Sequence, residues 1–190
     1  MRLVKNLCRI IVGIVFIYSG FVKGIDPLGS DYKFTDYFNA FGMGWMNATT
    51  LFFSFALSLA EFLIGIALLF NLWVSRMAWG SLLFMAFFTP LTLVLALTNP
   101  VSDCGCFGDA TLLTNWQTFW KNIILLLLAI MIFMYRKEYK SSLPLVGQFS
   151  FLALAGAGML CLSVYCYRHL PVLDFRPYAV GKNITEGMRL

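Results

Sequence analysis

Charge is scarce in this chain. Of its 190 residues, 12% are charged and 60% are hydrophobic, and the mean hydropathy is +0.80. A soluble domain is nearer half apolar and about a quarter charged. The composition therefore excludes an ordinary soluble globular protein and predicts an integral membrane protein.

Several other features are missing from the sequence. It contains one histidine, His169, and no internal repeat or low-complexity run. No stretch resembles a nucleotide-binding or nucleic-acid-binding motif. The net charge of +5 does not indicate a nucleic-acid partner, because the basic residues cluster at the ends of apolar segments. These absences exclude nucleotide-dependent enzymes and nucleic-acid-binding proteins.

Long apolar runs dominate what is present. Five segments are long enough to cross about 30 Å of hydrocarbon: residues 7–25, 50–71, 77–98, 117–135 and 147–167. The first follows a basic start, as a signal peptide does, but Lys23 and Asp26 stand where a small-residue cleavage site is expected. We therefore predict a retained helix and an all-α, five-helix membrane protein.

The distribution of basic residues predicts the orientation. An N-terminus on the cytoplasmic side places one basic group at that face: Arg2, Lys5, Arg9, Arg76, Arg136, Lys137 and Lys140. The opposite face carries more aspartates, although Lys23, Lys33 and Lys121 partly offset this bias. We predict a multi-pass protein of a bacterial inner membrane, with its C-terminus in the periplasm.

The segment "DPLGSDYKFTDYFNAFGMGWMN" separates the first two spans. Its aromatic residues Tyr37, Phe38, Phe41 and Trp45 recur at helical spacing. Aromatic side chains favour the membrane–water interface. We predict a short amphipathic interfacial helix, which can also cover a site formed by the loop after the third span.

The chain is predicted to divide into three parts. Residues 1–146 form a membrane bundle, residues 147–167 an additional transmembrane helix, and residues 168–190 a polar periplasmic tail or linker. The tail is too short to fold alone. It is predicted to contact a periplasmic partner or membrane complex, or to lead to something further on.

The loop "SDCGCFGD" is the most polar short stretch between spans. Cys104 and Cys106 stand two residues apart. In an extended chain, the Cα atoms of such residues are separated by nearly the largest distance that a disulfide can join, about 6.8 Å. Gly105 allows the backbone to bend. A bridge closed against strain is more easily reduced, and so small a ring stabilises the fold little. A redox-active pair is therefore favoured over a structural clamp.

Charged neighbours influence such thiols. Lys121, early in the fourth span, favours a thiolate, whereas Asp103 and Asp109 oppose it. Metal binding is the alternative, since two thiolates suit Cu(I) or Zn, but a closed site usually takes four ligands. The chain offers few further ligands, so no metal is predicted.

Two residues inside the spans need an explanation. Cys166 lies at the outer end of the fifth span, near the level of the cysteine loop. It is either a thiol that resolves a mixed disulfide or a small apolar residue of the helix. Cys161 is the weaker candidate, and Cys8 is expected to be inert. Glu61 lies near the middle of the second span, where a charge is costly.

Glu61 therefore needs a partner or a polar cavity. Ser19, Ser58, Thr89, Thr92 or Lys23 can provide one. Its role is a proton relay, a quinone contact, or an interhelical hydrogen bond.

These residues resemble a known family. "RIIVGIVFIYSGFVKGIDPLGSDYKFTDYFNAFG" resembles the start of DoxX-like membrane proteins, and "DCGCFGDATLLTNWQTFWKNIILLLLAI" resembles the MauE branch. The resemblance covers about residues 8–135 and implies a four-helix bundle with a redox-associated role. MauE proteins are associated with maturation of a disulfide-rich periplasmic dehydrogenase, and other relatives with quinone-linked enzymes. The fifth helix and the tail depart from this pattern.

Three functions remain open at this point. The first is a membrane thiol–disulfide oxidoreductase whose Cys104–Cys106 pair exchanges electrons with a periplasmic protein and with a quinone or second thiol pair. The second is a non-catalytic scaffold that assembles a periplasmic or secretory complex. A quinone-linked oxidoreductase subunit is a third possibility that rests on the resemblance alone.

Overall fold

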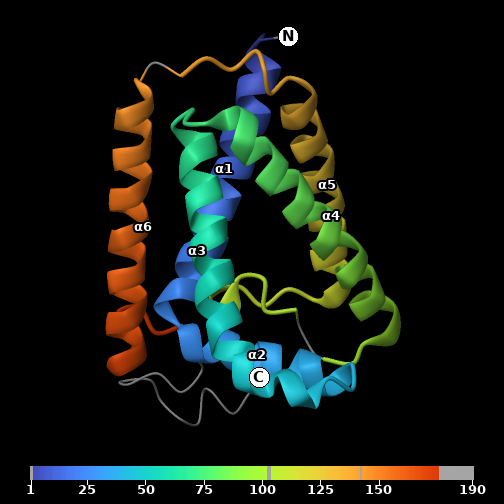
Figure 1. The fold of residues 1–190 in the computed structure, drawn as a ribbon. Coiled ribbons are helices and arrows are strands. Elements are labelled where there is room, and N and C mark those ends of the chain that lie inside the picture. Colours follow the sequence, from blue (N-terminus) through green and yellow to red (C-terminus); the bar gives the residue numbers. More distant parts are fainter. Residues whose placement is uncertain (1, 102–103, 142, 176–190) are drawn as a thin grey trace.

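The protein is all-helical in a computed structural model that describes residues 2–101, 104–141 and 143–175 (Figure 1). The elements in chain order are α1 (Arg2–Ile25), α2 (Pro27–Ala40), η1 (Gly44–Thr49), α3 (Thr50–Leu69), α4 (Val74–Thr98), η2 (Gly108–Ala110), α5 (Asn115–Met134) and α6 (Leu145–Arg168). The described residues include no strand. The all-α prediction is confirmed.

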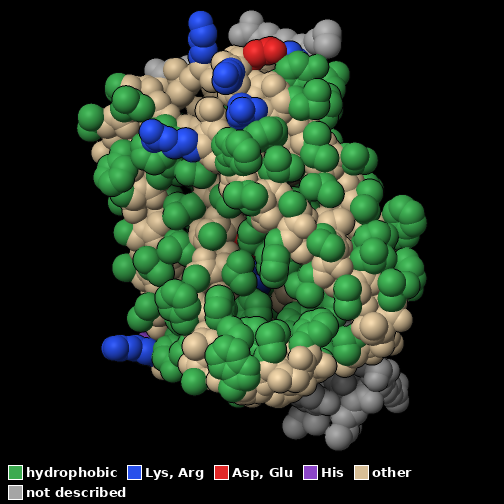
Figure 2. All heavy atoms as spheres, turned by 45° about the vertical axis from the view of Figure 1, so that its right-hand side comes forward, with side chains coloured by type: hydrophobic (Ala, Val, Ile, Leu, Met, Phe, Trp, Pro, Cys, Tyr) green, Lys and Arg blue, Asp and Glu red, His purple; other side chains and the backbone are tan. Residues whose placement is uncertain are grey.

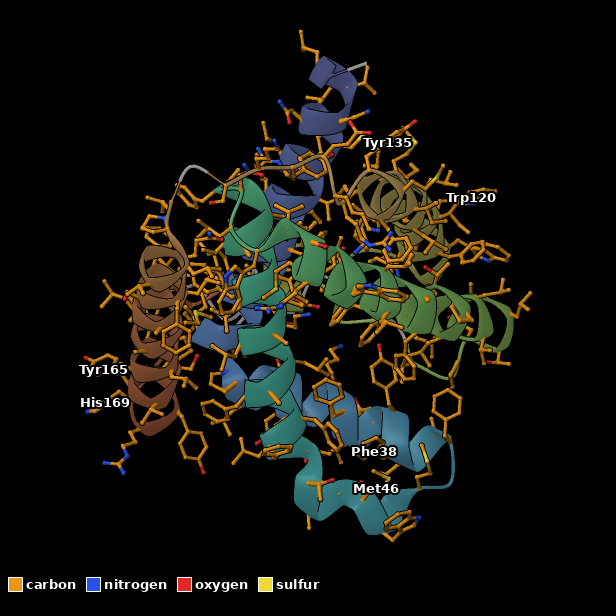
Figure 3. The ribbon with its side chains drawn as sticks, turned by 45° about the horizontal axis from the view of Figure 1, so that its top comes forward. Phe38, Met46, Trp120, Tyr135, Tyr165 and His169 are labelled. Atoms are coloured by element: carbon orange, nitrogen blue, oxygen red, sulfur yellow. The ribbon has the colours of Figure 1, made fainter. Side chains whose placement is uncertain are left out.

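Five helices are long and apolar enough to cross a membrane. They cover Leu3–Ile25, Gly44–Leu69, Val74–Thr98, Asn115–Met134 and Leu145–Arg168. Large apolar side chains cover their outer surfaces, as Trp120 does at 60% exposure, pointing away from the bundle (Figure 3). Such surfaces are stable only in contact with lipid. The chain is therefore a multi-pass membrane protein, and the five predicted spans are confirmed.

The helices form two close pairs and one outer helix. α1 packs along α3, α4 packs along α5, and α6 lies against α3 and α1 (Figure 1). α1 and α3 approach closely at Gly20 and Gly65: a Cβ atom on either glycine would lie 2.6 Å from a backbone nitrogen of the other helix. Small residues allow this kind of packing in membranes.

Basic side chains gather at the end of the bundle where α1 begins (Figure 2). Lys5 forms a 2.7 Å ion pair with Glu138, and its ammonium lies over the Tyr135 ring. The buried Arg9 guanidinium donates hydrogen bonds to the carbonyls of Leu68 and Leu69, which end α3. The arrangement groups the basic residues as expected, while the side of the membrane that they face stays a prediction.

α2 crosses the opposite end of the bundle (Figure 1). The Asp26 carboxylate accepts a hydrogen bond from the Gly29 amide at 3.0 Å, and Pro27 occupies the first turn, so the helix begins as its sequence indicates. It ends at Ala40, and Gly42 adopts a φ of +70°. This left-handed residue turns the chain out of the helix.

The early end of α2 changes the predicted aromatic face. Tyr37 and Phe38 lie on α2, whereas Phe41 caps it and Trp45 belongs to η1. The Phe38 ring meets Phe53 of α3 edge to face, with centroids 6.0 Å apart. A helix is present where we predicted one, but its aromatic face does not continue to Trp45. Its position at the membrane interface stays a prediction.

α6 is the additional fifth helix. At its start, Gln148 accepts a hydrogen bond from the Trp73 amide at 2.9 Å and donates one to the Leu143 carbonyl at 2.8 Å. At its end, the Tyr165 and His169 rings stack with centroids 4.5 Å apart (Figure 3). Most of the predicted tail, residues 176–190, lies outside the described residues. The division of the chain into three parts therefore stays a prediction.

Candidate functional site: a thiol pair in a membrane cavity

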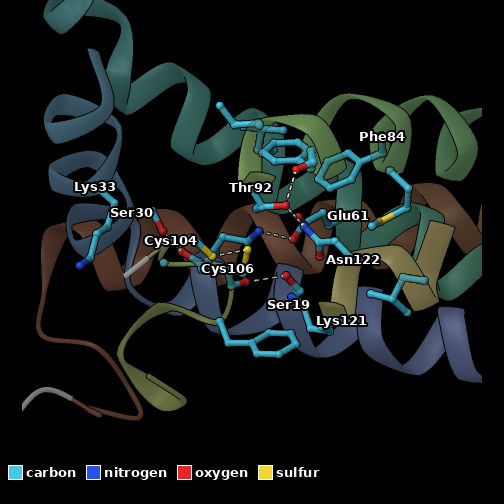
Figure 4. A pocket seen from close by; sticks show the side chains of 18 of the residues that line it. Ser19, Ser30, Lys33, Glu61, Phe84, Thr92, Cys104, Cys106, Lys121 and Asn122 are labelled. Carbon is cyan, nitrogen blue, oxygen red and sulfur yellow. Dashed lines mark hydrogen bonds and ion pairs between the residues drawn. The ribbon is translucent and has the colours of Figure 1, made fainter. Parts of the chain in front are cut away.

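The cysteine loop closes one end of a cavity inside the bundle (Figure 4). Side chains from α1, α2, α3, α4 and α5 line this cavity together with residues 104–107 of the loop. Its polar lining consists of Ser19, Lys23, Ser30, Lys33, Tyr37, Glu61, Thr92, Cys104, Cys106, Lys121 and Asn122. Residues far apart in the sequence therefore meet around the two thiols, and α2 covers the site as expected.

Two glycines shape the loop. Gly105 and Gly108 have φ values of +61° and +52°, and the Gly108 amide donates a hydrogen bond to the Gly105 carbonyl at 3.0 Å. Side chains with a Cβ rarely adopt these φ values. The sequence Cys-Gly-Cys-Phe-Gly is thus matched to a tight turn that brings the flanking cysteines together.

Two hydroxyl groups hold the loop against the helices. Tyr37 of α2 donates a hydrogen bond to the Cys104 carbonyl at 2.5 Å, and Ser19 of α1 donates one to the Cys106 carbonyl at 2.8 Å. Each carbonyl belongs to a cysteine of the pair. The two hydrogen bonds therefore fix the backbone that positions both sulfurs.

The two sulfur atoms are neighbours. Their Sγ atoms lie 2.6 Å apart (Figure 4), and both cysteines are free thiols in this structure. Cys104 is buried, at 8% exposure, while Cys106 is partly exposed. The Cys104 sulfur also lies 3.4 Å from the Thr118 hydroxyl, in the first turns of α5. The pair can therefore exchange a proton directly, and either sulfur can reach the other.

The surroundings make the two thiols unequal. The hydrogen bond with Cys106, aided by the Thr118 hydroxyl and the charge of Lys121, lowers the pKa of Cys104 from 9.0 to about 6 against the opposing effect of burial. The same hydrogen bond, followed by burial of the sulfur, raises the pKa of Cys106 well above 9.0. In the reduced pair Cys104 is the thiolate and Cys106 the thiol that donates to it.

Lys121 lies beside the loop, as the sequence suggested. Its ammonium is 4.1 Å from the centroid of the Phe107 ring, a cation–π geometry. The Phe107 ring in turn meets Tyr18 of α1 edge to face, with centroids 5.3 Å apart. This packing keeps the positive charge of α5 close to the thiol pair.

Glu61 forms a buried ion pair across the cavity. The Lys23 ammonium of α1 lies 2.5 Å from the Glu61 Oε2 atom of α3, and the two side chains are 12% and 5% exposed. Among the described residues, no further group donates a hydrogen bond to Oε2. Lys23 also faces Cys106, whose thiolate form its charge favours. The ion pair therefore lies next to the thiol pair.

The other polar groups that the sequence offers as partners of Glu61 are described residues that do not form a hydrogen bond with it. Ser19 binds the loop, Ser58 donates to the Phe55 carbonyl at 3.1 Å, and Thr92 donates to the Phe88 carbonyl while it accepts from Asn122 at 3.2 Å. The Thr89 hydroxyl is buried without a described partner. Of the five groups considered from the sequence, Lys23 contacts Glu61.

The remaining predicted site residues lie around or beyond the cavity. Asp109 is the last residue of the loop and belongs to η2, and Asp103 lies outside the described residues. Cys166 is buried at 2% exposure on α6, and neither it nor the exposed Cys161 lines the cavity. The structure thus does not bring Cys166 together with the loop thiols. No group of three or more metal-ligating side chains occurs within the described residues.

Tyr37 and Thr118 are the site residues that sequence reasoning missed. The aromatic spacing predicts Tyr37 only as an interfacial residue, and no sequence pattern assigns a role to Thr118. Thr118 carries a usable signal: it is fully buried and polar in the first turns of an apolar helix, one helical turn after the N-cap Thr114. A polar residue on the inner face so near the cysteine loop is a candidate partner for a thiol.

The low pKa of Cys104 leads to a measurable pH dependence. A thiolate alkylates and a thiol does not, so the reactive form is present above pH 6 and is lost as the pH falls through 6. We expect iodoacetamide to modify Cys104 of the reduced protein with a midpoint near pH 6, measured by mass spectrometry of the loop peptide. Cys106→Ala should move the midpoint up towards 9.0, and Lys121→Met should move it less. A midpoint that Cys106→Ala leaves in place would contradict the shared hydrogen bond.

Comparison with known proteins adds one match. The model of the family described as methylamine utilisation protein MauE matches residues 1–135, which include α1 to α5 and the cysteine loop. No curated protein and no solved structure matches the chain.

Proposed function

The chain belongs to the MauE family, and from that premise we propose that it is a membrane thiol–disulfide redox protein. Its Cys104–Cys106 pair exchanges electrons with a thiol protein on the periplasmic side. The observation that carries this proposal is the 2.6 Å separation of two unequal thiols in a cavity of the membrane bundle. A redox or accessory role in the membrane accords with the family.

The exchange begins from the oxidised pair. A thiolate of the partner attacks the Cys106 sulfur, a mixed disulfide forms, and the Cys104–Cys106 bond breaks with Cys104 leaving as a thiolate. A second thiolate of the partner then attacks the partner's sulfur that is bonded to Cys106. This forms the partner's disulfide and releases Cys106, which takes a proton. The partner loses two electrons and gains a disulfide, and the chain holds the reduced pair.

The site geometry favours attack at Cys106. A thiol of lower pKa is the better leaving group, and the pKa of Cys104 is about 6. The hydrogen bonds from Tyr37 and Ser19 hold both backbone carbonyls in place while the bond between the sulfurs opens and closes.

The test is the redox state of the pair in intact cells, trapped with a maleimide reagent too polar to cross the membrane. We expect a pair that is oxidised at rest, becomes labelled after mild reductant, and is reduced when a thiol substrate is supplied. Cys161→Ser and Cys166→Ser are matched controls that should leave this behaviour unchanged. A bridge that opens only in strong reductant and never reacts with a substrate would instead support the scaffold function.

A further inference from the structure

The cavity beside the thiol pair has a mixed lining. Its polar side chains include Lys23, Glu61 and Asn122. α4 supplies an aromatic wall, where the Phe84 and Phe88 rings stack at a centroid distance of 4.4 Å, and Asn122 reaches this helix through its 3.2 Å hydrogen bond to Thr92. A flat ring with polar substituents at its edge matches this lining better than a peptide or a polar metabolite does.

The cavity opens on the side of the bundle. Residues of α2, α3 and α4 line it, and the space-filling view shows a hollow between them with hydrophobic side chains at its mouth and a basic side chain at its base (Figure 2). α3 and α4 lie within candidate membrane spans. An opening flanked by two membrane-spanning helices is accessible from the apolar part of the bilayer, which favours a lipid-soluble ligand.

We propose that this cavity binds the ring of a lipid-soluble quinone, which accepts the electrons of the reduced Cys104–Cys106 pair. The inference rests on the proposed redox function and names its electron acceptor. The quinone ring lies against the aromatic wall, and Lys23 and Asn122 donate hydrogen bonds to its oxygen atoms. A two-electron carrier at this place would return the pair to its oxidised form after each exchange.

The reaction balances with the groups present. The Cys104 thiolate and the Cys106 thiol form one S–S bond and give up two electrons and one proton to the quinone. Lys23 supplies the second proton and regains it from water, so that quinone becomes quinol. Glu61, 2.5 Å from the Lys23 ammonium, stabilises the protonated amine between turnovers.

The other acceptor considered from the sequence was a second thiol pair. Cys161 is exposed on α6, Cys166 is buried on the same helix, and neither lines the cavity. Cys8 is buried in the apolar core among residues of α1, α3, α4 and α5. No other cysteine therefore lies at the wall of the cavity that the loop thiols face.

The experiment uses the full chain, purified and reduced in lipid nanodiscs without oxygen, with decylubiquinone as the probe. We expect the quinone to oxidise the Cys104–Cys106 pair and to form one quinol per pair. The loss of free thiols is measured by the gel shift that a polymer-linked maleimide produces. Leu91→Trp, which fills the cavity wall, should slow this step at least tenfold, whereas Leu97→Trp on the exposed face of the same helix should not. The double variant Lys23→Met with Glu61→Gln should also slow it while it keeps the charge balance.

Thiol exchange between the oxidised chain and a reduced dithiol peptide is measured in parallel without quinone. Exchange without oxidation by quinone would overturn the quinone inference and leave the proposed function standing. Failure of both reactions would overturn the proposed function as well. Equal rates for Leu91→Trp and Leu97→Trp, with both variants folded, would overturn the assignment of this cavity, and so would an unchanged rate in the double variant.

Discussion

Cys104→Ser is expected to accumulate a mixed disulfide between Cys106 and a partner protein, and Cys106→Ser is expected to accumulate roughly tenfold less. Attack at Cys106 leaves Cys104 as the departing thiolate, with a pKa of about 6. Because the exchange is reversible, Cys106 of the Cys104→Ser variant also attacks the disulfide of an oxidised partner. This attack forms the same mixed disulfide. Without the Cys104 thiolate, the chain cannot resolve that intermediate itself, and only the partner's second thiolate still releases Cys106.

The measurement is a non-reducing gel of acid-quenched cells that carry the tagged chain. Cys8→Ser and Cys161→Ser provide matched single-cysteine controls, because neither residue lines the cavity. More partner trapped on Cys106→Ser than on Cys104→Ser would reverse the assignment of the two sulfurs. No adduct on either variant, at a normal protein level, would argue against exchange through this loop.

Glu61→Gln is expected to lower the free energy of unfolding by about 3–5 kcal/mol, the usual cost of removing one partner from a buried ion pair. The substitution leaves the Lys23 ammonium, with a side chain 12% exposed, without its counter-charge. A charge in that position must either lose its proton or draw water into the bundle. Lys23→Met should be destabilising for the corresponding reason at Glu61.

The double variant Lys23→Met with Glu61→Gln separates pairing from side-chain loss. It should be more stable than either single variant, because no uncompensated charge remains. Glu138→Gln is the matched control: it breaks the Lys5–Glu138 ion pair, whose glutamate is 59% exposed, and should cost at most about 1 kcal/mol. Unfolding in mixed detergent, followed by circular dichroism, measures all four. Effects of Glu61→Gln and Lys23→Met that simply add would contradict the coupling.

Local sequence was sufficient for the helices. Each span is an apolar run longer than the hydrocarbon thickness, so its backbone must satisfy its own hydrogen bonds as a helix. The signals at individual helix ends are also local. α5 begins where Thr114 and Gln117 form a reciprocal capping box, and α2 ends just before Gly42. These features depend on residues a few positions apart.

The cysteine loop shows where local information ends. Its residues predicted a thiol pair able to close, because the glycine spacer and the oxidising side of the membrane could both be argued from the sequence. The pKa values of the two thiols depend first on the hydrogen bond between them and on burial, and then on Thr118 and Lys121 of α5 and Lys23 of α1. Those contacts follow from how the helices rotate and cross, which no short stretch of sequence specifies.

The sequence by itself thus determined a membrane protein of five spans with a Cys-Gly-Cys loop, because hydrophobicity, capping and glycine conformation act within a few residues. The tertiary structure alone decided that Lys23 pairs with Glu61, that Tyr37 and Ser19 hold the loop, and that an aromatic cavity adjoins the sulfurs. Each of these contacts joins different helices or a helix and the loop. Their energies depend on distance and burial, which arise only when the helices pack.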